Sequence, residues 1–178
     1  LDFKVKDVDC DFYSTSLHKW LFAPVGTGFL YVRREWIPRV WPLMGAPESL
    51  SNDIRKFESV GTQPMAMRTA IGEALAFHHS IGAERKWARL CYLRERWEDP
   101  LRANPRVILR NANDPRQSAG IGAVTVKGVE GPKLGEILEK KYRIHTRARV
   151  IPGEFECILV SPNLYTAVDE IDRFSAAI

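Results

Sequence analysis

The pattern of apolar and polar positions predicts a β-hairpin near the start of the chain. Residues 11–15, DFYST, alternate between apolar and polar side chains, and residues 28–32, GFLYV, are a short apolar run rich in β-formers. Between these runs, Pro24, Gly26 and Gly28 supply the residue types of a turn. We therefore expect two paired strands joined by a connection that contains residues 16–20, SLHKW.

Two helices are expected in the middle of the chain. Residues 35–47 are dense in Trp, Pro and Gly, which predicts an irregular segment packed on a larger domain. Pro64 marks the first turn of a helix, which Gly82 ends or kinks, and a second helix ends near Pro100. Helical spacing places Met67, Ala70, Ile71, Ala74, Leu75 and His78 on one face of the first helix, and Trp87, Leu90, Cys91, Arg94 and Trp97 on one face of the second.

Shorter elements follow residue 100. The pattern predicts strands at 106–110 and 122–127, a helix at 133–142, strands around Ile144 and Cys157, and a last helix from about Ala167. The inward-facing residues of the two helices are expected to be Leu134, Ile137, Leu138, Tyr142, Val168, Ile171 and Phe174. This mixture predicts a two-layer α/β domain with helices on one face of a small sheet.

The composition is that of a soluble globular protein that works inside the cell. The chain has 178 residues, of which 45% are hydrophobic and 27% charged, and no apolar stretch approaches the roughly 18 residues of a membrane helix. The net charge of +4 comes without a dense basic run, so we expect no nucleic-acid partner. Three widely separated cysteines favour a reduced, cytoplasmic setting and no metal site.

Lys19 is the residue with the clearest chemical potential. It lies in a tight, mostly apolar connection, where partial desolvation disfavours the ammonium form. A neutral lysine amine is a nucleophile toward carbonyl groups. The position therefore favours a lysine that holds an aldehyde cofactor, although an ordinary lysine in a turn is the alternative.

Three separated patches give the chain a resemblance to a known family. They are residues 11–28, DFYSTSLHKWLFAPVGTG, residues 57–62, FESVGT, and residues 160–166, VSPNLYT, followed by EID at 170–172. In order and spacing they resemble the lysine hairpin, the Gly-Thr turn and the C-terminal signature of the class V aminotransferases, a branch of the fold-type I pyridoxal 5'-phosphate (PLP) enzymes. Isopenicillin-N-epimerase-like members are the most similar in texture, with cysteine desulfurases as cousins.

The resemblance implies a fold and a domain organisation. It covers the C-terminal half of such an enzyme, so we expect an α/β fold in which residues 1–99 are the remainder of the large cofactor-binding domain with linking helices. Residues 100–178 would form the small two-layer α/β C-terminal domain. The chain is accordingly expected to be a fragment, one chain of a split enzyme with a companion chain, or a record that lost its first half.

The resemblance also implies roles for particular residues. Lys19 would form the internal Schiff base with PLP and then shuttle the α-proton of a small-molecule amine or amino-acid substrate. Ser16 and His18 would reach the cofactor phosphate, unless Ser16 only caps the turn and His18 is a structural polar group. Gly61 and Thr62 would contact the phosphate in the neighbouring subunit, which implies a homodimer, while a helix N-cap is the structural alternative for Thr62.

One position departs from the family pattern. Many relatives that handle amino acids carry an arginine two residues before Ser161, where this chain has Leu159. Arg147 and Arg149 are the nearest candidates to bind a substrate carboxylate instead. The other readings are a substrate without an ordinary α-carboxylate or a loss of activity.

Several functions stay open at this point. The leading hypothesis is an aminotransferase-type PLP enzyme, with racemisation or epimerisation and elimination, including carbon–sulfur cleavage, as alternative outcomes. Persulfide chemistry is disfavoured, because none of Cys10, Cys91 and Cys157 fits a nucleophile on a mobile loop. A catalytically silent partner that keeps the fold is the second hypothesis, and a basic nucleic-acid-binding module, motivated only by the pI near 9.1, is the third.

Overall fold

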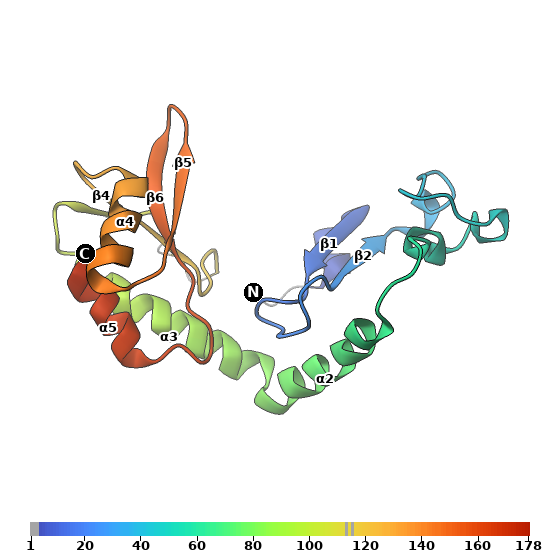
Figure 1. Cartoon of the computed structure of the whole chain (residues 1–178), viewed down its shortest axis with the longest axis horizontal. Helices are drawn as coiled ribbons and strands as arrows, with labels where there is room; N and C mark the ends of the chain where they lie inside the picture. Colours follow the sequence, from blue (N-terminus) through green and yellow to red (C-terminus); the bar gives the residue numbers. More distant parts are fainter. Residues whose placement is uncertain (1–3, 113, 115) are drawn as a thin grey trace. The chain divides into compact units, whose positions relative to one another are not determined.

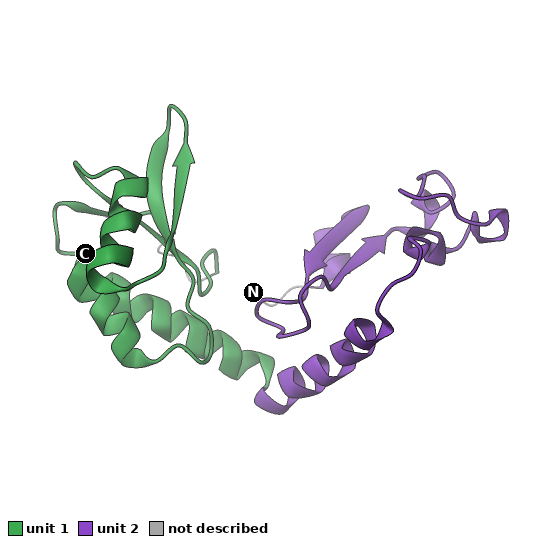
Figure 2. Cartoon of the chain, viewed as in Figure 1, with its two compact units in different colours: residues 1, 82–178 green, residues 2–81 purple. Residues whose placement is uncertain are grey.

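The computed structural model describes residues 4–112, 114 and 116–178. These residues form two compact units, one of residues 2–81 and one of residues 82–178. Figure 1 shows the elements in chain order, and Figure 2 shows the two units in separate colours. Each unit has its own packing.

The N-terminal unit is built on the predicted hairpin. After a short helix α1 (Val5–Val8), strands β1 (Phe12–Ser16) and β2 (Gly28–Val32) pair antiparallel, with Phe12 opposite Val32 and Ser16 opposite Gly28. Aromatic side chains cover the hairpin, since the ring centroids of Tyr13 and Phe29 lie 5.8 Å apart. The hairpin prediction is confirmed.

The segment after the hairpin is irregular, as its content of proline and tryptophan predicts. It contains the short 3-10 helices η1 (Arg34–Trp36), η2 (Glu48–Leu50) and η3 (Ile54–Glu58). The ammonium group of Lys56 is buried and donates hydrogen bonds to the backbone carbonyls of Ile37 and Ser51. Lys56 thereby ties two parts of this segment together.

Helix α2 (Met65–Ile81) begins after Pro64 and ends before Gly82, whose φ of 90° is left-handed. The predicted limits are confirmed, because a left-handed glycine stops a helix without steric cost. The predicted face is confirmed except at Leu75, which is exposed. Ala74 is buried, and the half-buried residues of this face are Met67, Ala70, Ile71 and His78.

Helix α3 (Ala83–Leu101) starts the C-terminal unit and keeps Pro100 inside its last turn. The expected end near Pro100 is confirmed to within one residue. The next backbone amide, that of Arg102, still donates to the carbonyl of Glu98 at 3.1 Å. Leu90, Arg94 and Trp97 are buried, as the predicted face requires.

The C-terminal unit is a four-stranded antiparallel sheet with helices on one face. Its strands are β3 (Val107–Leu109), β4 (Gly122–Val126), β5 (Arg147–Ile151) and β6 (Phe155–Val160), in the spatial order β3-β4-β6-β5. Helices α4 (Gly131–Tyr142) and α5 (Val168–Ala177) complete the unit. The two-layer α/β prediction is confirmed.

One hydrophobic core holds this unit together. It joins α3, α4 and α5 to one face of the sheet through Leu93, Trp97, Leu101, Val124, Val126, Leu134, Leu138, Ile158, Val160, Ile171 and Phe174. The rings of Trp97 and Phe174 meet edge to face at 5.4 Å. Ile137, expected to face inward, is instead exposed, because it lies at the border of the apolar stripe of α4.

The boundary between the units lies at Gly82, and α3 belongs to the C-terminal unit because it packs against α5. The predicted domain limits of 1–99 and 100–178 stay a prediction, since compact units of one chain do not define the domains of a longer protein. Within the described residues, no helix has the length and apolar character needed to cross a membrane. That part of the chain also lacks a metal-ligating group of three His, Cys, Asp or Glu side chains.

Candidate cofactor site

Lys19 lies in a hydrogen-bonded turn between β1 and β2. The backbone amide of Leu17 donates to the backbone carbonyl of Thr27 at 3.0 Å. The amide of Ala23 donates to the carbonyl of Leu17 at 3.1 Å, and the amide of Phe22 donates to the carbonyl of Lys19 at 3.2 Å. The Thr27 hydroxyl closes the end of the connection by donating to the carbonyl of Pro24 at 2.7 Å. The backbone that carries Lys19 is therefore held from both ends.

Two further features hold this connection in place. Phe22 has a φ of 66°, an uncommon value for a residue with a side chain, and its ring meets that of Phe77 on α2 edge to face at 5.7 Å. A Cβ on Gly28 would lie 2.9 Å from the backbone oxygen of Thr15, so only glycine permits the observed approach of the strands. Packing on α2 and close strand pairing together fix the position of Lys19.

The three predicted cofactor ligands of this hairpin lie at the end of β1. Ser16 is its last residue, and His18 and Lys19 follow within four positions. Ser16 and Lys19 are exposed, whereas Nδ1 of His18 is enclosed and has no hydrogen-bond partner within the described residues. The prediction that the Lys19 side chain is partly desolvated is wrong within the N-terminal unit, because the turn points this side chain outward.

This donor set fits the chemistry of PLP. An amine that no carboxylate pairs with among the described residues is available to an aldehyde, and a hydroxyl and an imidazole are suitable donors to a phosphate. A buried ring nitrogen without a partner costs free energy, and a bound group that supplies one removes this cost. Nδ1 of His18 is such a nitrogen.

Gly61 and Thr62 lie between η3 and α2. Both are exposed, and Gly61 has a φ of 84° with no atom within 4 Å of a Cβ built on it. The left-handed turn directs the chain into Pro64 and the first turn of α2, where Met67 donates to the carbonyl of Pro64 at 3.2 Å. Backbone amides of such a turn and of a helix start favour anions. The phosphate role assigned to Gly61 and Thr62 agrees with this preference and stays a prediction.

Arg147 and Arg149 lie on β5, and the pairing register locates them relative to Leu159. Arg147 stands directly opposite Leu159 on β6, and Arg149 stands opposite Cys157. Paired residues of antiparallel strands project to the same face of a sheet. Arg147 is therefore a neighbour of the position at which the family pattern is broken, a relation that sequence proximity alone does not reveal.

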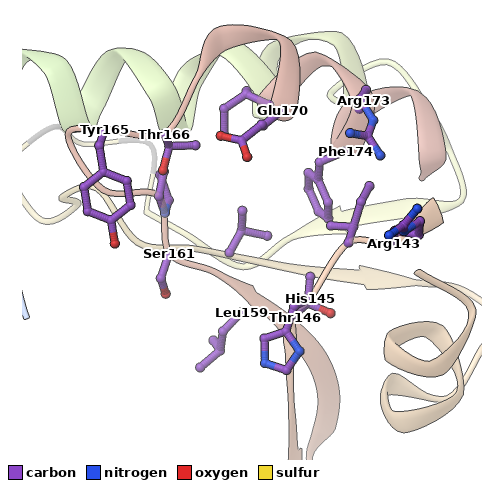
Figure 3. Close-up of a pocket in the computed structure, with 14 residues that line it drawn as sticks. Arg143, His145, Thr146, Leu159, Ser161, Tyr165, Thr166, Glu170, Arg173 and Phe174 are labelled. Atoms are coloured by element: carbon purple, nitrogen blue, oxygen red, sulfur yellow. The ribbon is translucent and has the colours of Figure 1, made fainter. Parts of the chain in front are cut away.

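A hollow of about 470 Å³ opens beside the end of β6 (Figure 3). It brings together Ser161 and Tyr165 from the C-terminal patch and the preceding Leu159. Two arginines that the sequence prediction did not include, Arg143 and Arg173, also line it. Arg173 donates to the carbonyl of Tyr142 at 2.9 Å. Because Tyr142 ends α4, this contact explains Arg173 as a cation at a helix C-terminus, where it complements the helix dipole.

Two cysteine thiols in the C-terminal unit are unsuited to nucleophilic work. Burial raises the pKa of both Cys91 and Cys157 above the ordinary value. A higher pKa means less thiolate at neutral pH, and the thiolate is the reactive form. The structural role that the sequence favoured for these two residues agrees with their burial.

The comparison with known protein families decides the classification. The sequence model of the family described as aminotransferase class-V matches residues 1–174. The chain belongs to the class-V aminotransferase family. PLP is the cofactor of this family, and the lysine hairpin, the Gly-Thr turn and the C-terminal signature all lie within the matched part of the chain.

Curated class-V relatives include enzymes with different reactions. Isopenicillin N epimerase of Streptomyces clavuligerus is 28% identical over an alignment that covers 100% of this chain and 49% of the relative. Hercynylcysteine sulfoxide lyase of Schizosaccharomyces pombe is 32% identical over 48% of this chain and 24% of the relative. The chain thus spans about half the length of the epimerase that it matches along its whole length.

Solved structures confirm the class-V fold. A cysteine desulfurase from Thermococcus onnurineus NA1, in its apo form, superposes with a TM-score of 0.78 at 22% identity, over 97% of this chain and 47% of that protein. A cystine C–S lyase in complex with its product, cysteine persulfide, gives a TM-score of 0.74 at 24% identity, over 96% of this chain and 46% of that protein. The chain has the fold of the C-terminal part of these enzymes.

Proposed function

We propose that the protein works as a PLP-dependent enzyme of the class-V aminotransferase type, with Lys19 as the residue that holds the cofactor covalently. Its substrate is a small molecule that carries an amine. The observation that carries the proposal is the rigid hairpin turn, which presents the exposed Lys19 amine beside Ser16 and the unpartnered His18 nitrogen. Membership of the family supports the choice of PLP.

Each hairpin residue has a distinct part in this proposal. With PLP bound, Nζ of Lys19 would hold it covalently, and the same nitrogen would take the proton from the substrate α-carbon and return it. The Ser16 hydroxyl and the His18 imidazole donate hydrogen bonds to the phosphate. When bound, PLP supplies an electron sink for the negative charge that develops on the substrate carbon.

The assembly proposed for this enzyme is a homodimer. Gly61 and Thr62 are exposed and form a left-handed turn ahead of α2, which suits a contact with the cofactor phosphate of a second copy. In such an arrangement each active site needs residues from two chains. The exposure of both residues supports this role.

Bound PLP would support transamination, epimerisation and elimination alike. The atom to which Lys19 returns the proton would decide between the first two, and a β-leaving group on the substrate would favour the third. The epimerase and the lyase among the relatives support the second and third outcomes as much as the first. Incubation with amino acids in D₂O, with and without a keto acid, separates the three outcomes by the products formed.

Labelling of lysine tests the cofactor role. We expect incubation with equimolar PLP, borohydride reduction and peptide mass mapping to find a pyridoxyl group on Lys19, with at least tenfold less on the exposed lysines Lys6 and Lys133. The K19A variant should lose the adduct and the absorbance of the bound cofactor. Equal labelling of all three lysines would contradict the proposal.

A catalytically silent partner is the second candidate function. The observation that favours it is Leu159, which offers no charge to a substrate carboxylate. In that case Lys19 takes up no cofactor, although the fold is intact. Absence of a pyridoxyl adduct in folded protein, shown by an unchanged circular dichroism spectrum, would select this candidate.

A further inference from the structure

The sheet of the C-terminal unit has a second face that the core does not use. Side chains alternate between the two faces of a strand, and Val124 and Ile158 point into the core. Their neighbours Thr125, Cys157 and Leu159 therefore project to the opposite face, together with the paired residues of β5. These residues lie outside the hydrophobic core cluster.

Arginines from opposite edges of the sheet lie on this second face. Arg149 enters from β5, opposite Cys157. Arg110, just after β3, folds inward over the sheet, because its guanidinium lies 4.6 Å from the centre of the Phe155 ring and its Nε donates to the Thr125 hydroxyl at 3.1 Å. Both of these contacts hold Arg110 in one orientation.

Cys157 projects to the same face and is paired with Arg149 on β5. Its side chain is buried, with 3% of the residue exposed. Arg110 and Arg149 both lie close enough to lower the pKa of the thiol, although burial has the larger effect and raises it. Two positive charges thus approach the same small part of the face from opposite sides.

Within the described part of the chain, Arg110, Arg147 and Arg149 form no ion pair with a carboxylate. The nearest acidic residue along β6, Glu156, accepts a hydrogen bond from the amide of Gly131 at the start of α4. Like charges that share a site repel each other, and an anion between them removes the repulsion.

We propose that Arg110 and Arg149, with Arg147 beside them, form a binding site for the carboxylate of a small organic molecule. A carboxylate is planar and offers two oxygens to the fork of a guanidinium. The apolar surroundings, which include Phe155 and Leu159, suit the carbon skeleton of an organic acid better than a free inorganic phosphate. The identification of this carboxylate with that of the substrate rests on the proposed function.

Protection of strand edges is the other established use of cations on such strands. It accounts for Arg147 and Arg149, because β5 is an edge strand. It does not account for Arg110, whose guanidinium lies over the inner strands at Thr125 and Phe155. A ligand between the strands accounts for all three residues.

Titration of the full chain with succinate, monitored by the arginine Nε–H resonances in NMR spectra, tests the site. We expect saturable shifts for Arg110 and Arg149 in low salt, and none for Arg85, an exposed arginine of α3. R149Q should weaken succinate binding at least tenfold, whereas R85Q, the same change of charge in the same unit, leaves binding unchanged. R149K should retain part of the binding, because it keeps the charge and loses the fork.

Other outcomes overturn the inference. Equal weakening by R149Q and R85Q would show nonspecific charge attraction, and saturable binding of inorganic phosphate without succinate would show a different ligand. Loss of dispersed amide resonances in R149Q would show that this variant is unfolded. Succinate binding by R110Q and R149K, judged by the same criteria, would then decide. Labelling of Lys19 by PLP without succinate binding refutes the carboxylate site alone, while succinate binding without labelling refutes the proposed function alone.

Discussion

At the scale of single residues, Arg94 and Glu98 form a buried ion pair. Their side chains are only 5% and 3% exposed, and Nε of Arg94 lies 3.6 Å from Oε2 of Glu98. Burial raises the pKa of Glu98, and the nearby charges of Arg94 and Arg102 act against this shift. The carboxylate therefore depends on its arginines for stability inside the core.

Removal of one arginine tests this dependence. R94M should lower the free energy of unfolding by about 3 kcal/mol, because it leaves a buried carboxylate without its main partner. R102M should cost less than about 1 kcal/mol, since Arg102 pairs with Glu98 from a side chain that is 43% exposed. Denaturant unfolding of the two variants measures both values, and equal losses would contradict the argument.

The sequence predicted the burial of Arg94 but not that of Glu98. Arg94 was expected on the buried face of α3 from its helical spacing, and the structure confirms this. The burial of Glu98 was not predicted, because it depends on Gly122, whose added Cβ would lie 3.0 Å from Oε1 of Glu98. A contact between residues so far apart along the chain has no local signal in the pattern.

At the scale of elements, glycines control how closely strands and helices approach. A Cβ on Gly122 at the start of β4 would lie 2.2 Å from the Trp97 ring on α3. A Cβ on Gly135 inside α4 would meet Ile158 at 3.5 Å, an ordinary contact. The same substitution is thus expected to have opposite effects at these two positions.

The pair G122A and G135A tests this expectation. G122A should destabilise the protein by about 2 kcal/mol, since the tryptophan ring or the strand must move. G135A should stabilise it by up to about 1 kcal/mol through the helix propensity of alanine and the added contact. Thermal unfolding midpoints give both signs, and a stable G122A would show that the packing is looser than described.

Element types followed from the sequence more readily than buried faces. The hairpin, α2, α3 and the two-layer unit have periodic patterns or turn residues that predict them locally. The face of α2 was predicted correctly except at Leu75, because apolar spacing signals burial without showing which surface covers each residue. The prediction that Lys19 is partly desolvated was wrong for the same reason.

At the scale of the whole molecule, the two units differ in how much core they contain. The hydrophobic cluster lies entirely within the C-terminal unit. Among residues 4–81, the part of the N-terminal unit that the structure describes, the buried apolar residues are Ala23, Val32, Ile37 and Ala74. Cooperative unfolding depends on the amount of apolar surface that a unit buries.

Separate expression of the two units tests this difference. Residues 82–178 alone should unfold in one cooperative transition and show dispersed amide resonances. Residues 1–81 alone should lack a cooperative transition, because its buried apolar surface is too small to offset the loss of chain entropy. A sharp transition in the N-terminal fragment would contradict this account.

The sequence by itself determined the family resemblance, the lysine hairpin and the order of the elements, because each depends on neighbouring residues whose types and spacing are local. Only the tertiary structure decided that Leu75 and Ile137 are exposed, that Arg147 stands beside Leu159, and that Arg110 lies over Thr125 and Phe155. Strand pairing and helix packing set these relations between segments far apart along the chain, and no local pattern encodes their register.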